Sequence, residues 1–183
     1  RPEGGMSETG RALGPALALF EPDRPHNLGA ALRLAACLGV ELHVIEPCGF
    51  PLDDRRIRQS GLDYVAFARW LRHADFAAFE AAALGPRSPP AAGREYAPRR
   101  LVLLTTRASM PYHRASYRAD DVLLVGRESR GAPPWLHARA DLAVRVPMRP
   151  GVRSLNVIVA AALVLGEAMR QTGAFDRLES RED

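Results

Sequence analysis

Short runs of apolar residues recur along the chain and are separated by longer segments of mixed polarity. Most of these runs lack the alternation of polar and apolar side chains that marks a strand with one wet face, so they are typical of strands covered on both faces, as in a parallel sheet. The predicted strands are Ala16–Phe20, Val40–Glu46, Ala66–Trp70, Leu101–Leu104, Val122–Val125 and Leu142–Val146.

The segments between these runs carry helix signals. Asn27 is a good N-cap for a helix over Leu28–Leu38, and Gly39 is a typical stop. Ser154 is placed to cap a nearly all-apolar final helix. The further predicted helices are a short one from Asp53 to about Gly61, an Ala-rich one over Asp75–Leu84, and the final one over Leu155–Thr172. Strands that alternate with helices favour an α/β fold, with a parallel sheet flanked by helices.

A chain of 183 residues fits a single domain with a sizeable core. We place that domain at residues 16–173, between a flexible N-terminal extension (1–15) and a C-terminal tail (174–183). Residues 85–98 are rich in Pro, Gly and Ala, which favours a surface insertion over a domain boundary.

The charge of the chain is basic, at +4 with a pI of about 9.7. Every basic residue is Arg, and no Lys occurs. Arginine binds phosphate bidentately and stacks on bases, so this usage fits a polyanionic partner, although a compositional bias of the source genome gives the same pattern. Cys37 and Cys48 form no C-x-x-C or Cys/His cluster, which predicts that both are reduced packing residues in a cytosolic protein and form no metal site. No apolar run is long enough to span a membrane.

Three polar blocks each follow a predicted strand. They are Asn27-x-Gly29-x-x-x-Arg33, Gly126-x-Glu128-x-x-Gly131, and Val146-Pro147-Met148 with Ser154-Leu155-Asn156. Glycines at the carboxyl edge of a parallel sheet let a ligand approach the backbone. Helix N-termini at the same edge offer free N–H groups.

Each block also has a plain structural interpretation. The first fits an N-cap, a tolerated Gly and a surface Arg33, and the second fits a solvated Glu128 paired with Arg130. The third fits a turn from strand to helix with Ser154 as its cap. Walker, G-x-G-x-x-G, G-x-S-x-G and H-E-x-x-H motifs are absent from the sequence, so those classes of nucleotide, hydrolase and metalloprotease site are not predicted.

In this order and at this spacing, the three blocks resemble the signature blocks of the SpoU branch of the SPOUT RNA methyltransferases. Further segments resemble the short members that methylate the ribose of the tRNA wobble nucleotide: Ile45-Glu46-Pro47-x-Gly49-Phe50, Arg58-x-x-Gly61-Leu62-Asp63-Tyr64 and Leu104-Thr105-Thr106. The resemblance implies a C-terminal trefoil knot, an obligate homodimer, and S-adenosyl-L-methionine bound in the knot by main-chain groups, with S-adenosyl-L-homocysteine as product.

The resemblance also assigns the functional residues. The catalytic set that it implies is Asn27, Arg33, Glu128, Ser154 and Asn156. The implied cofactor-binding residues are Leu104, Thr105, Gly126, Glu128, Gly131, Val146, Met148 and Ser154. Arg33 would activate the ribose hydroxyl. Because a guanidinium keeps its proton at neutral pH, it fits anchoring a phosphate and stabilising alkoxide charge better than acting as a base.

The function that the resemblance implies is S-adenosylmethionine-dependent methylation of the ribose 2′-OH at tRNA position 34, on cytidine or modified uridine. The expected partners are the tRNA anticodon stem-loop and a second copy of the chain, without membrane or DNA, in the cytoplasm. Three alternatives stay open: action on another tRNA or rRNA site, an RNA-binding homologue without turnover, and a generic α/β ligand-binding domain.

Overall fold

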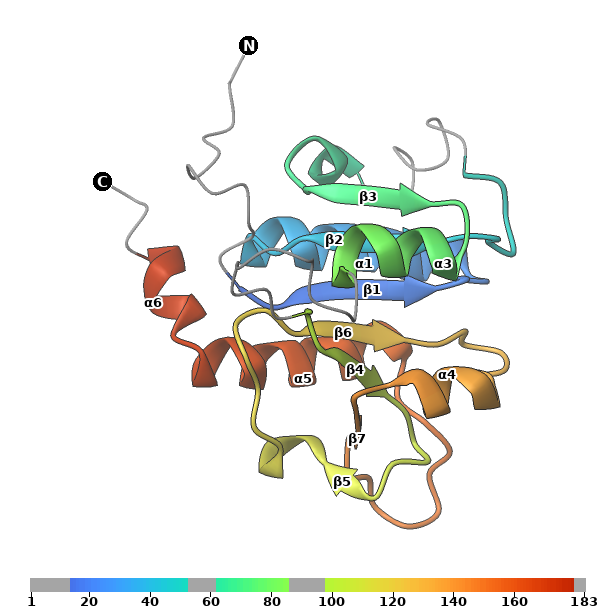
Figure 1. The fold of residues 1–183 in the computed structure, drawn as a ribbon, viewed down its shortest axis with the longest axis vertical. Coiled ribbons are helices and arrows are strands. Elements are labelled where there is room, and N and C mark those ends of the chain that lie inside the picture. The colour runs from blue at the N-terminus through green and yellow to red at the C-terminus, as the bar shows by residue number, and fades with distance from the viewer. Residues whose placement is uncertain (1–13, 53–61, 86–97, 180–183) are drawn as a thin grey trace, which may run out of the picture.

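The computed structural model describes residues 14–52, 62–85 and 98–179. The predicted helix at 53–61, most of the predicted N-terminal extension and most of the 85–98 insertion lie outside these ranges. The described strands form one seven-stranded sheet in the order β3-β2-β1-β6-β4-β7-β5, and all its pairings are parallel (Figure 1). The predicted α/β class with a parallel sheet is therefore confirmed.

Three of the six predicted strands are confirmed to the residue, and two are confirmed with shorter bounds. The strands are β1 Ala16–Phe20, β2 Leu42–Ile45, β3 Trp70–His73, β4 Leu101–Leu104, β5 Met110–Pro111, β6 Val122–Val125 and β7 Leu142–Arg145. The prediction of a strand over Ala66–Trp70 is wrong, because Leu62–Ala66 forms a 3₁₀ helix and the strand begins only at Trp70. The two-residue β5 was not predicted.

The helices lie on both faces of the sheet. They are α1 Pro25–Leu38, α3 Phe76–Phe79 with a π-helical extension over Glu80–Leu84, α4 Pro134–Arg139, α5 Val157–Gln171 and α6 Ala174–Glu179. A short 3₁₀ helix covers Tyr112–Arg114. Among the described residues, α4 and α6 were not predicted, and α6 occupies part of the predicted C-terminal tail.

Two predicted helix starts are wrong. Helix α1 begins at Pro25, whose fixed φ suits the first helical position, so Asn27 lies inside the first turn and is buried instead of capping it. Helix α5 begins at Val157 and is capped by Asn156, not by Ser154. The predicted stop at Gly39 is confirmed, with a left-handed φ of 63°.

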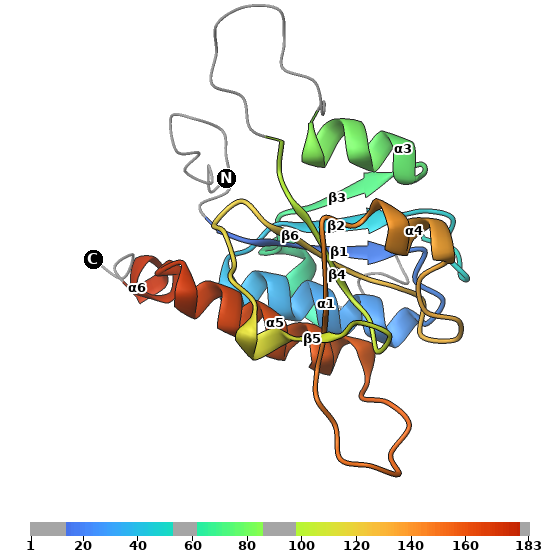
Figure 2. The ribbon, with the colours of Figure 1, turned by 60° about the horizontal axis from the view of Figure 1, so that its bottom comes forward.

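The central strands β1, β2, β4 and β6 pack on both sides, as their apolar runs predict. Leu17 and Leu19 belong to the core cluster that contains α1 and α5, whereas Ala16, Ala18 and Phe20 belong to the cluster on the opposite face. Figure 2 shows α1 and α5 together on one face, with α3 and α4 across the sheet from them. Parallel strands between two helical layers direct all their carboxyl ends to the same edge of the sheet.

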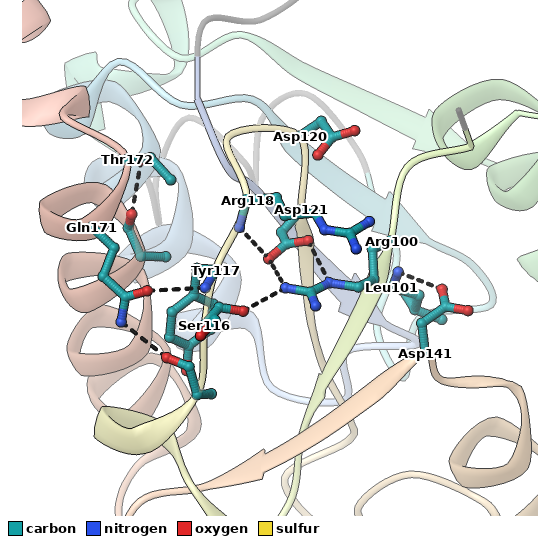
Figure 3. Close-up of polar contacts among 12 residues, drawn as sticks. Arg100, Leu101, Ser116, Tyr117, Arg118, Asp120, Asp121, Asp141, Gln171 and Thr172 are labelled. Atoms are coloured by element: carbon teal, nitrogen blue, oxygen red, sulfur yellow. Dashed lines mark hydrogen bonds and ion pairs between the residues drawn. The ribbon is translucent and has the colours of Figure 1, made fainter. Parts of the chain in front are cut away.

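At the opposite edge, the buried carboxylate of Asp121 ties the segment before β4 to the turn before β6 (Figure 3). Arg100, which precedes β4, donates to both oxygens of Asp121, at 2.9 and 2.7 Å. The Arg118 N–H donates to the same carboxylate at 2.9 Å. The hydrogen bonds that Arg100 donates to Asp121 raise the pKa of Arg100. Gln171 of α5 adds a further tie, since it accepts from the Tyr117 N–H and donates to the Ala115 carbonyl.

Replacing Asp121 with Ala is expected to lower the free energy of unfolding by about 3 kcal/mol, because the largely buried Arg100 would be left without its counter-charge. The control is Asp120→Ala, which removes the neighbouring carboxylate and is expected to cost less than about 0.5 kcal/mol. Urea unfolding of both variants measures the difference. Equal destabilisation by the two substitutions would show that the Arg100–Asp121 pair does not stabilise this edge.

Candidate active site

The carboxyl edge of the sheet contains a cavity of about 350 Å³. The loops after β4, β6 and β7 form its wall, together with the first turn of α5. All of the predicted cofactor-binding residues line it: Leu104, Thr105, Gly126, Glu128, Gly131, Val146, Met148 and Ser154. Its volume falls within the range of small-molecule sites. Residues from three distant parts of the sequence therefore meet at one concave site.

The loop after β6 is tightly closed on itself. Gly131 has a left-handed φ of 67°, and its N–H donates to the Arg127 carbonyl at 2.8 Å. A Cβ on Gly126 would lie 2.5 Å from the Ala132 nitrogen. The glycine at position 126 is thus required by the backbone of its own loop, whereas the sequence pattern had related it only to the approach of a ligand.

Asn27 connects all three polar blocks. It is only 4% exposed. Its side-chain nitrogen donates to Glu128 Oε2, and its Oδ1 accepts from Asn156 Nδ2 at 2.9 Å. Asn156 Oδ1 in turn accepts from the N–H groups of Ile158 and Val159, at 2.9 and 3.2 Å. One chain of hydrogen bonds therefore joins the start of α1, the loop after β6 and the start of α5.

The carboxylate of Glu128 stands at the wall of the cavity and is partly exposed. Besides Asn27, it contacts the ring of His26, whose Nε2 lies 3.8 Å from Glu128 Oε2. The side-chain contacts of Glu128 are therefore with α1, whereas the plain interpretation of this loop paired it with Arg130.

Arg33 lies apart from the other predicted catalytic residues. It is exposed on α1, and its guanidinium carbon lies 5.0 Å from the centroid of the Tyr64 ring, which is a cation–π contact. Glu128 and Ser154 line the cavity, and Asn27 and Asn156 are bonded to its wall, but Arg33 does not line it. Four of the five predicted catalytic residues are thus brought together within one chain.

Several arginines of the described ranges form ion pairs with carboxylates. They include Arg69, Arg100 and Arg170 away from the cavity and Arg127 at its wall. Around the cavity mouth, the described residues offer no carboxylate partner to the exposed arginines, which are Arg107, Arg130, Arg149 and Arg153. Unpaired guanidinium groups around a cavity favour the binding of an anionic partner.

One residue of this edge was not predicted from the sequence. Asp23 accepts hydrogen bonds from the backbone of Glu128 and Ser129, although more than 100 residues separate them in sequence. The available signal was an acidic residue placed directly after a buried strand, in the segment Glu21-Pro22-Asp23. That signal is weak, because such residues are usually solvated.

The described residues contain no group of three or more His, Cys, Asp or Glu side chains that could hold a metal ion. No helix among them is both long and apolar enough to cross a membrane.

Neither cysteine forms a disulfide, and Cys37 is exposed rather than packed. Burial, reinforced by Glu46, raises the pKa of Cys48 to about 12, so this thiol stays protonated.

Comparison with known proteins places these features in a family. The model of the SpoU rRNA Methylase family matches residues 15–166. The chain is 51% identical to a tRNA (cytidine(34)-2′-O)-methyltransferase of Beijerinckia indica over 88% of this chain and 94% of that protein, and 39% identical to the Escherichia coli K12 enzyme of the same name over 86% and 93%. A solved structure concerned with the 2-OH methylation of C/U34 on tRNA superposes with a TM-score of 0.73, at 37% identity, over 86% of this chain and 89% of that one. The chain therefore belongs to the SpoU rRNA Methylase family.

Proposed function

We propose that this protein transfers a methyl group from S-adenosyl-L-methionine to the ribose 2′-oxygen of the wobble nucleotide, cytidine or modified uridine 34, in tRNA. The observation that carries the proposal is the convergence of the three polar blocks on one cavity through Asn27. The relatives support the choice of substrate, since this chain spans almost the full length of proteins named for that reaction.

The cavity suits the proposed cofactor. Its wall combines apolar side chains, such as Leu104, Val146 and Met148, with the polar loop after β6, in which Gly126 and Gly131 carry no side chain. Leu104, Thr105, Gly126, Gly131, Val146, Met148 and Ser154 would hold the cofactor there, chiefly through the main chain. When bound, it would supply an electrophilic methyl group on a sulfonium sulfur.

The side chains around the cavity would position the ribose. Asn27 fixes the carboxylate of Glu128, and Asn156 fixes Asn27, so Glu128 is held in place at the cavity wall, which Ser154 also lines. Such preorganisation is the main contribution that a protein makes to an in-line transfer. Arg33 would bind the phosphate beside the target ribose and stabilise the charge that develops on its 2′-oxygen.

We further propose that the enzyme works as a homodimer. Arg33 lies outside the cavity of its own chain, so a second copy is the simplest source of this group at the site. Helix α5 leaves an apolar stripe unpacked, with Val159 at 52% and Leu163 at 43% exposure. This stripe continues from Leu155, which lines the cavity, and exposed apolar surface of this kind marks interfaces.

The trefoil knot would involve the strands and loops that form the cavity. In the sheet, β4 lies between β6 and β7 although it precedes both in the sequence, so the chain has to cross over itself there. The anticodon stem-loop would contact the arginines at the cavity mouth. The reaction would take place in the cytoplasm, where tRNA is modified.

The direct test is transfer of a labelled methyl group to purified tRNA, followed by mass spectrometry of the modified nucleotide. We expect 2′-O-methylation at position 34. With Arg33→Ala, turnover is expected to fall by about 100-fold or more, as for other groups that stabilise transition-state charge. Cofactor affinity, measured by calorimetry, is expected to stay near that of the wild type, because Arg33 does not line the cavity.

The outcomes separate the alternatives. Methylation of rRNA or of another tRNA position would show that the protein catalyses the same methyl transfer on a different RNA substrate. Cofactor binding without transfer to any RNA would identify a non-catalytic homologue, and the absence of cofactor binding would reject methyl transfer altogether. Full turnover by Arg33→Ala would remove this residue from the mechanism.

The arginines at the cavity mouth predict a salt dependence of RNA binding. Replacing Arg107 or Arg153 with Ala is expected to reduce the slope of log affinity against log salt by about 1 for each phosphate that the removed guanidinium would have bound. Arg170→Ala is the matched control, because this exposed Arg is paired with Glu167 at the far end of α5. Filter binding to tRNA over a salt series gives the slopes. A change in the control as large as in Arg107→Ala would assign the effect to net charge alone.

The apolar stripe of α5 predicts the oligomeric state. Leu163→Glu is expected to convert a dimer into a monomer at micromolar concentration, because it places a charge in the middle of the proposed interface. Leu71→Glu is the control, since Leu71 is similarly exposed but lies on the edge strand β3. Sedimentation equilibrium distinguishes the states. A wild-type monomer, or equal dissociation by both variants, would contradict an interface at α5.

A further inference from the structure

We propose that Asp23 is a positioning residue, which holds the loop after β6 so that Glu128 keeps its place at the cavity wall. This inference rests on the proposed function for its kinetic consequences, and on the described contacts for its geometry. Asp23 lies between β1 and α1 and does not line the cavity. Its effect on the reaction therefore has to pass through other residues.

The contacts of Asp23 are concentrated on one peptide segment. Its Oδ1 accepts from the Glu128 N–H and its Oδ2 from the Ser129 N–H, both at 3.2 Å. The Ser129 hydroxyl donates to Oδ2 as well. Both oxygens of one carboxylate are thus used by two consecutive residues of the loop. Although partial burial opposes it, these hydrogen bonds lower the pKa of Asp23, so the carboxylate is ionised at neutral pH.

The backbone of Asp23 is itself held in place. The Gly49 N–H donates to the Pro22 carbonyl at 3.0 Å, and a Cβ on Gly49 would lie 2.9 Å from the Asp23 Cα. Glu21 has a left-handed φ of 45°, which is unfavourable for a residue other than glycine, and its side chain pairs with Arg127. The two acidic residues around Pro22 therefore contact three consecutive residues of the loop, 127–129, from a segment with little freedom to move.

This arrangement anchors Glu128 twice. Asp23 holds its main-chain nitrogen, while Asn27 holds its carboxylate. Without Asp23, the side-chain bond to Asn27 would remain, but the peptide between residues 128 and 129 would be free to rotate away from the sheet edge. Because the same loop lines the cavity, neither the carboxylate nor the main-chain groups offered to a ligand would keep their fixed positions.

The test compares Asp23→Ala, Asp23→Asn and Asp23→Glu. Asp23→Ala is expected to reduce kcat by about 10- to 100-fold, the effect typical of misplacing a reacting group by about 1 Å, with little change in KM for tRNA. Asp23→Asn should also be impaired, because its amide keeps only one acceptor oxygen and places an NH2 group opposite the second N–H donor. Asp23→Glu should recover part of the activity, because it restores the charge and both acceptors.

The matched control is Asp75→Ala. Asp75 also accepts a backbone N–H, from Ala78 at 2.7 Å, but it caps α3 away from the cavity. A general loss of stability would affect both variants, whereas the proposed role affects kcat only at position 23. Combining Asp23→Ala with Glu128→Ala adds a second criterion, since residues that act through one another give effects that do not add.

Hydrogen exchange provides a readout that does not depend on turnover. In Asp23→Ala, the amides of Glu128 and Ser129 are expected to exchange faster, while those of β6 stay protected. If the wild type methylates no RNA, the proposed function fails, and exchange together with binding of S-adenosyl-L-homocysteine still decides the role of Asp23. Unchanged exchange and unchanged ligand affinity in Asp23→Ala would overturn the proposal, and so would additive effects in the double variant.

Discussion

The site is organised around one buried amide, that of Asn27. A buried side-chain amide has to satisfy both of its ends, because leaving one unpaired costs about as much free energy as breaking a hydrogen bond. Here the two ends are satisfied by Glu128 and by Asn156, from separate parts of the sheet edge. If either segment moved, Asn27 would be left with an unsatisfied group in the protein interior. The burial of Asn27 therefore couples the position of the loop after β6 to the start of α5, and so fixes the shape of the cavity between them.

Most of the fold could be predicted because its strands are continuous apolar runs with polar ends. Leu101–Leu104, for example, lies between two arginines and two threonines, and the observed strand has the same bounds. The error at Ala66–Trp70 arose because an edge strand has one neighbour and little burial, so the local pattern cannot set its register. Pairing with Leu42 places the start of the strand at Trp70, and Phe67 is 76% exposed in the preceding turn.

The sequence could predict which residues form the site, but not which of their side chains contact one another. The polar residues after β4, β6 and β7 had to meet, because parallel strands share a carboxyl edge. Side-chain partners depend on how segments more than 100 residues apart in the sequence pack together. For this reason the sequence predicted that Asn27 caps its helix and did not identify Asp23 as part of the site. Arg33 shows a further limit of prediction from sequence. Its spacing predicts which face of α1 it occupies, whereas its distance from the cavity depends on how α1 packs against the sheet.

Helix α5 connects the proposed assembly to the chemistry. Its first residues are capped by Asn156, which also bonds Asn27, while Val159 and Leu163 expose apolar surface within the next two turns. A rigid helix transmits a displacement along its length, so a partner packed on Leu163 would restrain the cap and hence the cavity wall. In the proposed homodimer, association would restrain the start of α5, which lines the cavity, and would bring an Arg33 from the second copy. A monomer would contain the cavity residues, but it would lack both the restraint on α5 and the Arg33 of a partner. This gives a physical reason for such an enzyme to act only as a dimer.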